Sequence, residues 1–226
     1  MTQKITVFNA IRIIKNRFEI GAIVIILSIC MPSHLVYAGI EKDIKLPDGG
    51  VYSGEMKDGL FNGEGRIAWT NGNIYKGAFL KGLFHGVGTY LLANGTVYKG
   101  DFQEGFFHGK GLMIYPNGDK YEGEFKKGFY DGNGQLTYFS GFSCKGQFKL
   151  SVMEGKGECR YQNGDVYIGD FKDDQPNGKG KLITIDGDTY IGQFKHGEFN
   201  GIGKYTYKSG EVLEGEFVAG KYLKKE

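Results

Sequence analysis

The chain has 226 residues, of which 39 are glycine and only 4 are proline, and 15% are aromatic. This aromatic content argues against a disordered linker, and the scarcity of proline argues against collagen. The formal net charge is +2, but four of the 28 basic residues and one of the 26 acidic residues lie in the first 38 positions. The rest of the chain carries a net charge of −1, so the charge balance does not predict a nucleic-acid partner.

Residues 1–38 have the composition of a secretory signal peptide. Basic residues end at Arg17, an apolar run follows at residues 20–31, and Val36-Tyr37-Ala38 offers branched or small side chains just before Gly39. The apolar run has twelve residues, whereas a membrane-spanning helix needs about 20. We therefore expect an exported protein of the periplasm, the cell envelope or the medium. An uncleaved N-terminal membrane anchor is the alternative.

A short lead-in at residues 39–48 precedes an internal repeat that occupies residues 49–220, and a basic tail at residues 221–226 follows it. The repeat is 23 residues long and occurs about seven and a half times without insertion or deletion. We number each copy from its tyrosine, so that position 1 is Tyr52, Tyr75, Tyr98, Tyr121, Tyr167 and Tyr190. Position 3 is always glycine, position 5 is phenylalanine in every copy after the first, and positions 12 and 14 form a Gly-x-Gly pair. Such regularity indicates a repeat architecture.

Each copy predicts two short antiparallel strands. The segments on either side of the Asn-Gly or Asp-Gly dipeptides are rich in tyrosine, phenylalanine, isoleucine and valine, as strands are. The dipeptides, such as Asn71-Gly72, favour a type I′ turn with positive φ at both centres. We expect the Gly-x-x-x-Gly-x-Gly segment to form a corner that leads into the next copy. A β-bulge is also expected, because a plain two-residue loop would pair apolar positions with polar ones.

The motif Y-x-G-x-F-x-x-G-x-x-x-G-x-G resembles the MORN repeat, the "membrane occupation and recognition nexus". The segment from Tyr98 to Gly111 matches it throughout, and the likeness covers residues 49–220. The resemblance implies an all-β fold, an elongated single-layer antiparallel array of hairpins. Strands about 4.8 Å apart would make this array roughly 70 Å long. The family uses its repeats for membrane association, dimerisation or scaffolding.

Catalytic, cofactor and metal sites are not predicted. His85 and His108 occupy equivalent places two strands apart, which puts them roughly 10 Å from each other, too far to share a metal easily. The Gly-x-Gly pairs lack the helix that a phosphate-binding loop requires. Asp119, Asp165 and Asp188 follow the turns one per copy, which is too sparse for calcium.

Two rows of side chains are candidates for binding. Position 6 carries a lysine in most copies, and a row of Lys126, Lys149, Lys172 and Lys195 could meet an anionic partner or pair with the acids at position 4. The second row is apolar, at the predicted corner. It could serve as a docking edge or pack beneath its own corners, and consists of Phe61, Phe84, Phe107 and Tyr130.

The fifth copy departs most from the pattern. Cys144 replaces its tyrosine, Ser151 replaces a glycine, and Cys159 lies in its next strand. An oxidising compartment permits a disulfide between the two cysteines. Two buried free thiols are the alternative.

These features predict an exported, non-enzymatic repeat protein that acts as a binding or scaffolding surface in a bacterial envelope. A protein partner is the first expectation. Membrane phospholipid and polysaccharide are the alternatives, and the chain could form a homodimer. No cofactor and no nucleic acid are expected.

If the leader is cleaved, the exported protein begins at Gly39. We expect the intact mass of the natively exported chain to equal that of residues 39–226. A mass that corresponds to the full 226 residues would instead indicate the uncleaved anchor.

Overall fold

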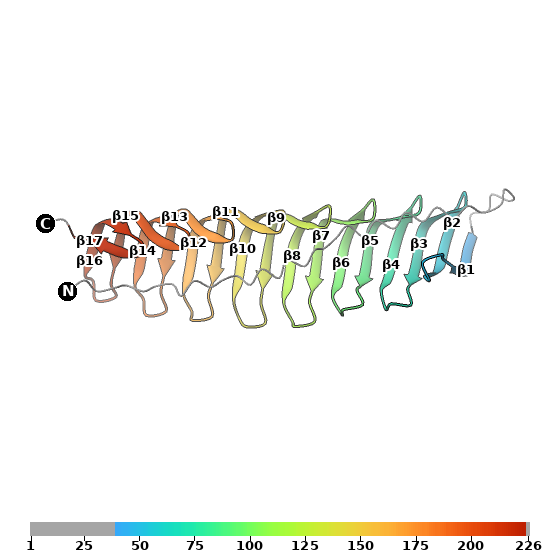
Figure 1. Ribbon diagram of the computed structural model, residues 1–226, viewed down its shortest axis with the longest axis horizontal. Helices are drawn as coiled ribbons and strands as arrows, with labels where there is room; N and C mark the ends of the chain where they lie inside the picture. The colour runs from blue at the N-terminus through green and yellow to red at the C-terminus, as the bar shows by residue number, and fades with distance from the viewer. Residues whose placement is uncertain (1–38, 225–226) are drawn as a thin grey trace. The chain divides into compact units, whose positions relative to one another are not determined.

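The computed structural model describes residues 39–224, so the predicted leader lies outside the described residues. The described residues contain seventeen strands and no helix. The chain divides into two compact units, whose described parts are residues 39–130 and 131–224. We call them the N-terminal and the C-terminal unit. The strands of each unit lie side by side, and each strand pairs antiparallel with the next (Figure 1).

The N-terminal unit contains β1 (Gly39–Lys45), β2 (Val51–Lys57), β3 (Leu60–Ala68), β4 (Ile74–Leu80), β5 (Leu83–Leu91), β6 (Val97–Gln103), β7 (Phe106–Ile114) and β8 (Lys120–Lys126). β9 (Phe129–Thr137) begins at the boundary between the units. The C-terminal unit continues with β10 (Ser143–Lys149), β11 (Val152–Arg160), β12 (Val166–Lys172), β13 (Gln175–Ile183), β14 (Thr189–Lys195), β15 (Glu198–Thr206), β16 (Val212–Val218) and β17 (Lys221–Leu223). The predicted hairpin repeat is confirmed. The expected lead-in and tail, however, contribute strands β1 and β17.

The tight turns lie at a different place from the one predicted. Asp58 and Gly59 join β2 to β3 with φ of 54° and 74°, so the type I′ geometry belongs to positions 7 and 8. The Asn-Gly dipeptides sit in longer loops instead. In the first of these loops, Gly72 has positive φ whereas Asn71 does not, and the Asn71 side chain accepts a hydrogen bond from the backbone N–H of Asn73. The prediction of Asn-Gly type I′ turns was therefore wrong.

The bulge was predicted beside the Asn-Gly turn, but β3 pairs with β4 across that loop without a register shift. The bulge lies instead between β2 and β3, where it explains the glycine at position 12. Gly54 pairs with Gly65 and Met56 pairs with Phe61, so three residues of β3 face the single residue Glu55. The middle one of the three, Gly63, has φ of 78°, a left-handed conformation that favours glycine. The glycine-rich segment is thus a tight turn followed by a bulge inside one nine-residue strand, and not a single corner.

Aromatic rings that lie flat on glycine build the core. The ring of Tyr52 lies over the backbone of Gly65, where an added Cβ would come within 2.7 Å of the ring. The ring also stacks on Phe61 with centroids 3.8 Å apart. The Tyr52 hydroxyl donates a hydrogen bond to the backbone carbonyl of Glu55. The same bond recurs from the tyrosines of five further copies, Tyr75, Tyr98, Tyr121, Tyr167 and Tyr190.

The phenylalanine at position 5 joins one copy to the next. Phe79 meets Tyr75 of its own copy edge-on, with centroids 5.1 Å apart, and Tyr52 of the preceding copy at 5.3 Å. Each ring pair of this kind contributes roughly 0.5–1.5 kcal/mol beyond the burial of its area. Cohesion within a unit therefore runs between neighbouring copies, as in other repeat proteins.

The structure decides between the two roles that the sequence left open for the apolar row, and the row packs inward instead of forming a docking edge. Phe61, Phe84, Phe107 and Tyr130 are 1–7% exposed. All four stack on the tyrosine of their own copy. They pack inside the fold, because the tight turn places position 10 on the same face as the tyrosine.

The fifth copy keeps the core with different chemistry. The structure joins Cys144 and Cys159 in a disulfide across β10 and β11. No tyrosine ring is available to cover Gly146 and Gly157, and the methyl group of Met153 takes its place, within 2.7 Å of a Cβ built on either glycine. The loss of the tyrosine is thus accompanied by a flexible side chain that fills the same space.

We expect Ser151→Gly to stabilise the protein by roughly 1 kcal/mol, since Ser151 has φ of 62° at a position where most copies carry glycine. Thermal unfolding of the two proteins measures the effect. Ser143→Gly is the matched control, because Ser143 lies in β10 and glycine there loses stability. Equal or lower stability of Ser151→Gly would contradict the assignment of strain to this turn.

Alkaline pH should unfold the protein through its buried tyrosines. Burial raises the pKa of Tyr90 and of Tyr190 from 10.0 to about 12. Above pH 10 the unfolded chain loses protons that the folded chain keeps, so stability is complete below pH 10 and falls as the pH rises toward 12. We expect urea midpoints to be similar at pH 8 and pH 9 and much lower at pH 11, with phenolate absorbance appearing as the fold is lost. Ionisation of these tyrosines near pH 10 with no loss of stability would contradict this account.

Candidate functional site

The two faces of each hairpin differ in their accessibility to a partner. Successive side chains of a strand point to opposite faces, and positions 1, 3 and 5 face the aromatic core. Positions 2, 4 and 6 face outward, as do positions 13 and 15 of the second strand. Only the outward face is available for a partner.

A groove of about 950 Å³ lies on the outward face of the C-terminal unit, across β10–β15. The glycines at positions 3 and 14 line its floor, where register pairing sets Gly146, Gly157, Gly169, Gly180 and Gly192 side by side. Outward side chains line it on either side of the glycines. All its lining residues belong to the C-terminal unit.

The first side of the groove is a row of cross-strand neighbours from positions 2 and 15. Register pairs link each member to the next in the order Lys145, Glu158, Ile168, Lys181, Ile191 and Lys204. We call these six residues the Ile168 row. Cross-strand neighbours of this kind have Cβ atoms about 5 Å apart. The row is therefore a continuous strip of mixed apolar and charged side chains, and all of its members except Lys204 line the groove.

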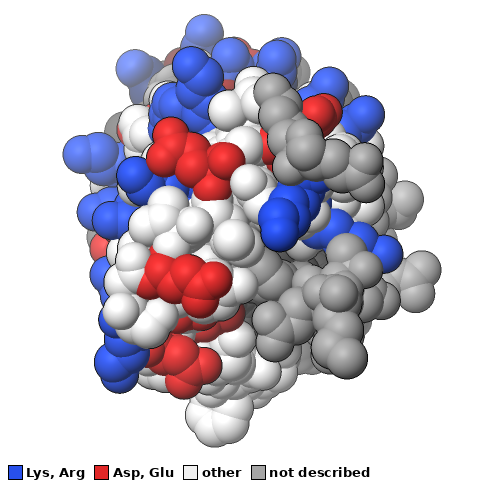
Figure 2. All heavy atoms as spheres, turned by 90° about the vertical axis from the view of Figure 1, so that its left-hand side faces the viewer, with Lys and Arg blue, Asp and Glu red and all other residues white. Residues whose placement is uncertain are grey.

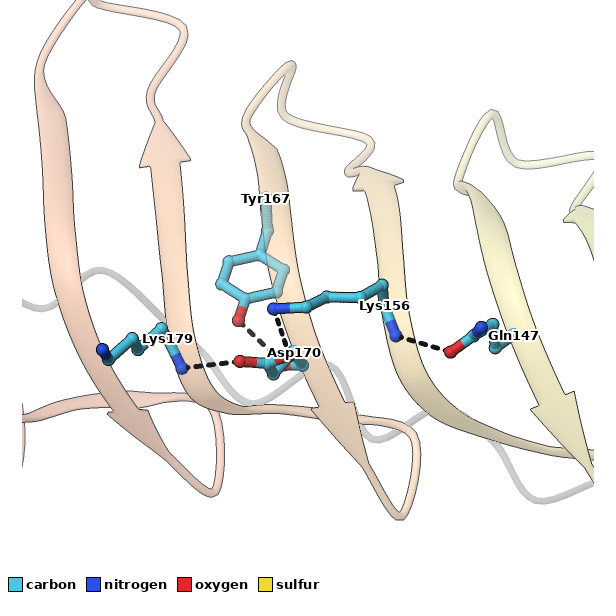
Figure 3. Close-up of polar contacts among 5 residues, drawn as sticks. All are labelled: Gln147, Lys156, Tyr167, Asp170 and Lys179. Carbon is cyan, nitrogen blue, oxygen red and sulfur yellow. Dashed lines mark hydrogen bonds and ion pairs between the residues drawn. The ribbon is translucent and has the colours of Figure 1, made fainter.

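The second side carries Lys156 and Lys179, which contact Asp170 beside the groove (Figure 3). Lys156 forms an ion pair with the Asp170 carboxylate, with Nζ 2.6 Å from Oδ1, and the backbone N–H of Lys179 donates to Oδ2 at 3.0 Å. The Lys156 hydrogen bond lowers the pKa of Asp170, so this carboxylate stays charged at neutral pH. Tyr167 donates to the Asp170 backbone carbonyl from the core side. Asp170 thus ties the bulge of β13 to β12 and is not a free acid.

Other copies use an amide or a carboxylate for the same purpose. Gln147 and Gln193 accept from the backbone N–H groups of Lys156 and Ile202, at 3.1 and 3.0 Å. Glu55 does so in the first copy, at 3.1 Å. Position 4 therefore serves the bulge, and the ion pair of its acid Asp170 is made with Lys156 at position 13 and not with a position 6 lysine.

The groove exposes isoleucine where the fold does not need it. Ile168, Ile191 and Ile202 are 45%, 55% and 64% exposed. Position 2 carries Ser53 and Lys76 in the first two copies, so an apolar side chain is no requirement of the repeat. Contiguous exposed apolar side chains rimmed by polar ones are typical of interaction sites.

The groove also holds uncompensated positive charge. Lys145 and Lys181 are exposed, and no ion pair of either lysine occurs among the described residues. Lys204 is paired with Glu214 at 3.2 Å, on the exposed surface. On the side of the molecule that carries β16 and β17, acidic and basic side chains both occur on the surface (Figure 2). The lysines of the Ile168 row therefore favour an anionic ligand locally, although the protein as a whole is near neutral.

The predicted lysine row lies outside this groove. Lys149, Lys172 and Lys195 are exposed at equivalent places in β10, β12 and β14, and strand alternation puts them on the outward face. Lys126 is exposed in the N-terminal unit. An anionic partner for this row stays a prediction.

The residues that line the groove were not predicted from the sequence. The signal was available, because isoleucine at position 2 in two successive copies breaks the polar character of that position. The roles of the turn acids were also missed. Asp165 and Asp188 accept from the backbone N–H groups of Ile185 and Lys208, both at 2.9 Å, and so bind each loop to the next.

These features define an antiparallel β-hairpin repeat protein, in which every copy adds one hairpin and one slice of aromatic core. Seven consecutive stretches match the model of the MORN repeat, at residues 52–74, 75–97, 98–120, 121–142, 144–166, 167–189 and 190–212. The chain belongs to the MORN-repeat family. No curated protein matched it.

Similar solved structures include the TCP domain of Drosophila melanogaster SAS-4 in complex with a proline-rich motif. That match is 17% identical, covers 70% of this chain and 88% of that domain, and has a TM-score of 0.44. The TCP10 domain of Danio rerio CPAP is 14% identical over 75% of this chain and 90% of its own, with a TM-score of 0.31. A Staphylococcus aureus virginiamycin B lyase is 14% identical over 79% and 69%, with a TM-score of 0.20. These scores are too low to carry an argument about function.

Two kinds of feature are absent from the described residues. Within residues 39–224 there is no helix of the length and hydropathy that crossing a membrane requires. The same part of the chain brings together no group of three metal-ligating side chains.

Proposed function

We propose that this MORN-repeat chain is an exported, non-enzymatic protein of a bacterial envelope that binds a protein partner through the groove of its C-terminal unit. The observation that carries the proposal is the exposure of Ile168, Ile191 and Ile202 between lysines on one face. The exposed part of each isoleucine side chain gains no burial free energy in the folded chain, whereas its burial by a partner gains roughly 25 cal/mol per Å².

The side chains of the groove favour binding over catalysis. Its lining consists of glycine, lysine, isoleucine, one glutamine and Glu158. Glu158 forms an ion pair with Arg160 at 2.6 Å, and Asp170 beside the groove is held by Lys156. A catalytic site needs groups with pKa values shifted toward their task. Here the acids are engaged in ion pairs, so a scaffold or binding surface is the better account.

Export rests on two features of the chain. The leader at residues 1–38 has the order of basic, apolar and small residues that signal peptides have. The Cys144–Cys159 disulfide is suited to an oxidising compartment.

A photo-crosslinking amino acid placed in the exported protein tests the groove in living cells. We expect a probe at Ile191 to give a discrete protein adduct, because this side chain lies in the groove. Ile185 is the matched control, since it is 67% exposed in the same unit but does not line the groove. Equal adducts from both positions, or none from Ile191, would count against the proposed site.

A further inference from the structure

We propose that the groove receives an acidic amphipathic α-helix of the partner, with its apolar side chains against the three isoleucines and its carboxylates beside Lys145 and Lys181. This inference rests on the proposed function and specifies the chemistry of the partner. Three features of the groove support it: the hydrogen bonding of its backbone, the distance between equivalent residues of successive copies, and the charge of its lysines.

The backbone N–H and C=O groups of β11–β14, which form the floor of the groove, are not available to hydrogen-bond a ligand. Each of the strands β11–β14 is paired on both sides, so its N–H and C=O groups are taken up in the sheet. A segment that lies across this face must satisfy its own backbone groups when they are buried. An α-helix does so internally, whereas an extended peptide needs a free strand edge. The groove therefore favours a helix over an added strand.

The spacing of the groove agrees with two turns of a helix. Ile168 and Ile191 are equivalent residues on β12 and β14, and Lys156 and Lys179 are equivalent residues on β11 and β13. Two strand spacings amount to roughly 9.6 Å. Residues seven apart in a helix are separated by about 10.5 Å along its axis. One helical face can thus meet successive copies of the repeat with equivalent side chains.

The charges of the groove select the sign of the helix. Lys145 and Lys181 belong to the same row as Ile168 and Ile191 and are not engaged in ion pairs with described residues. A partner with carboxylates beside its apolar stripe would neutralise them, and a basic helix would be repelled. Specificity would therefore come from the lysines, while the isoleucines supply the buried area.

Three synthetic helical peptides of 21 residues test the inference on the exported protein. They share a leucine stripe of heptad spacing and differ in flanking residues, which are glutamate, lysine or serine. We expect the glutamate peptide to bind at least tenfold more tightly than the lysine peptide, to gain helical circular dichroism on binding, and to lose its advantage in high salt.

Charge reversal supplies the decisive comparison. The double variant Lys145→Glu with Lys181→Glu should reverse the preference between the glutamate and lysine peptides. Lys172→Glu is the matched control, since Lys172 is exposed on the same face outside the groove.

The isoleucines are tested separately. Ile202→Asp should weaken binding of the glutamate peptide tenfold, whereas Ile185→Asp should not. These residues are exposed, so the variants are expected to fold, which thermal unfolding checks.

Vesicles of phosphatidylglycerol and a cell-wall oligosaccharide are the competing probes. Binding of either through Lys145 and Lys181 without binding of the glutamate peptide would overturn the inference, as would a charge-reversed variant with unchanged preference. If the Ile191 crosslink persists while the peptides fail, the proposed function stands and only the helix is wrong. If the Ile191 crosslink also fails, both the proposed function and the helix inference are wrong.

Discussion

The fold depends on one contact, the face of a tyrosine ring laid on the backbone of two paired glycines. Tyr98 illustrates it: a Cβ added to Gly111 would lie 2.6 Å from the ring, and the hydroxyl reaches the backbone carbonyl of Asp101 at 2.7 Å. The ring covers the sheet, stacks on Phe107 and closes a hydrogen bond at its far end. Within residues 39–224, the strands of each unit thereby acquire a buried core without a second sheet or helix to cover it.

The same contact gives the two faces of the sheet different roles, since one face forms the core and the other faces outward. Because the rings occupy the inward face, the outward positions are free of packing constraints and can vary between copies. Position 2 is lysine in Lys99 and isoleucine in Ile168, with the fold unchanged around it. Substitutions at outward positions can therefore create a binding surface with little loss of stability. The groove results from the particular outward side chains of these copies, because the backbone is the same in every copy.

The fifth copy shows what the constraint demands. With Cys144 in place of tyrosine, the glycine pair would be left bare, and the methyl group of Met153 covers it instead. The requirement is a filled space above the glycines, and aromatic stacking is the usual means of filling it. This explains how a copy can lose its most characteristic residue and still pair with its neighbours, as β10 and β11 do.

The sequence by itself determined the repeat length, the strand-rich hairpin architecture and the family, because these follow from local periodicity and glycine placement. It placed the bulge in the Asn-Gly hairpin, whereas the register places it between β2 and β3. It misplaced the type I′ turn, since Asp58-Gly59 and Asn71-Gly72 carry similar turn signals and only the pairing register distinguishes them. It also left Phe61 and its equivalents between an inward and an outward role. Only the tertiary structure decided that they stack on tyrosine, and only it brought Ile168, Ile191 and Ile202 from separate copies into one groove. The physical reason is that strand pairing sets which residues share a face across copies, and that information does not lie within any single repeat.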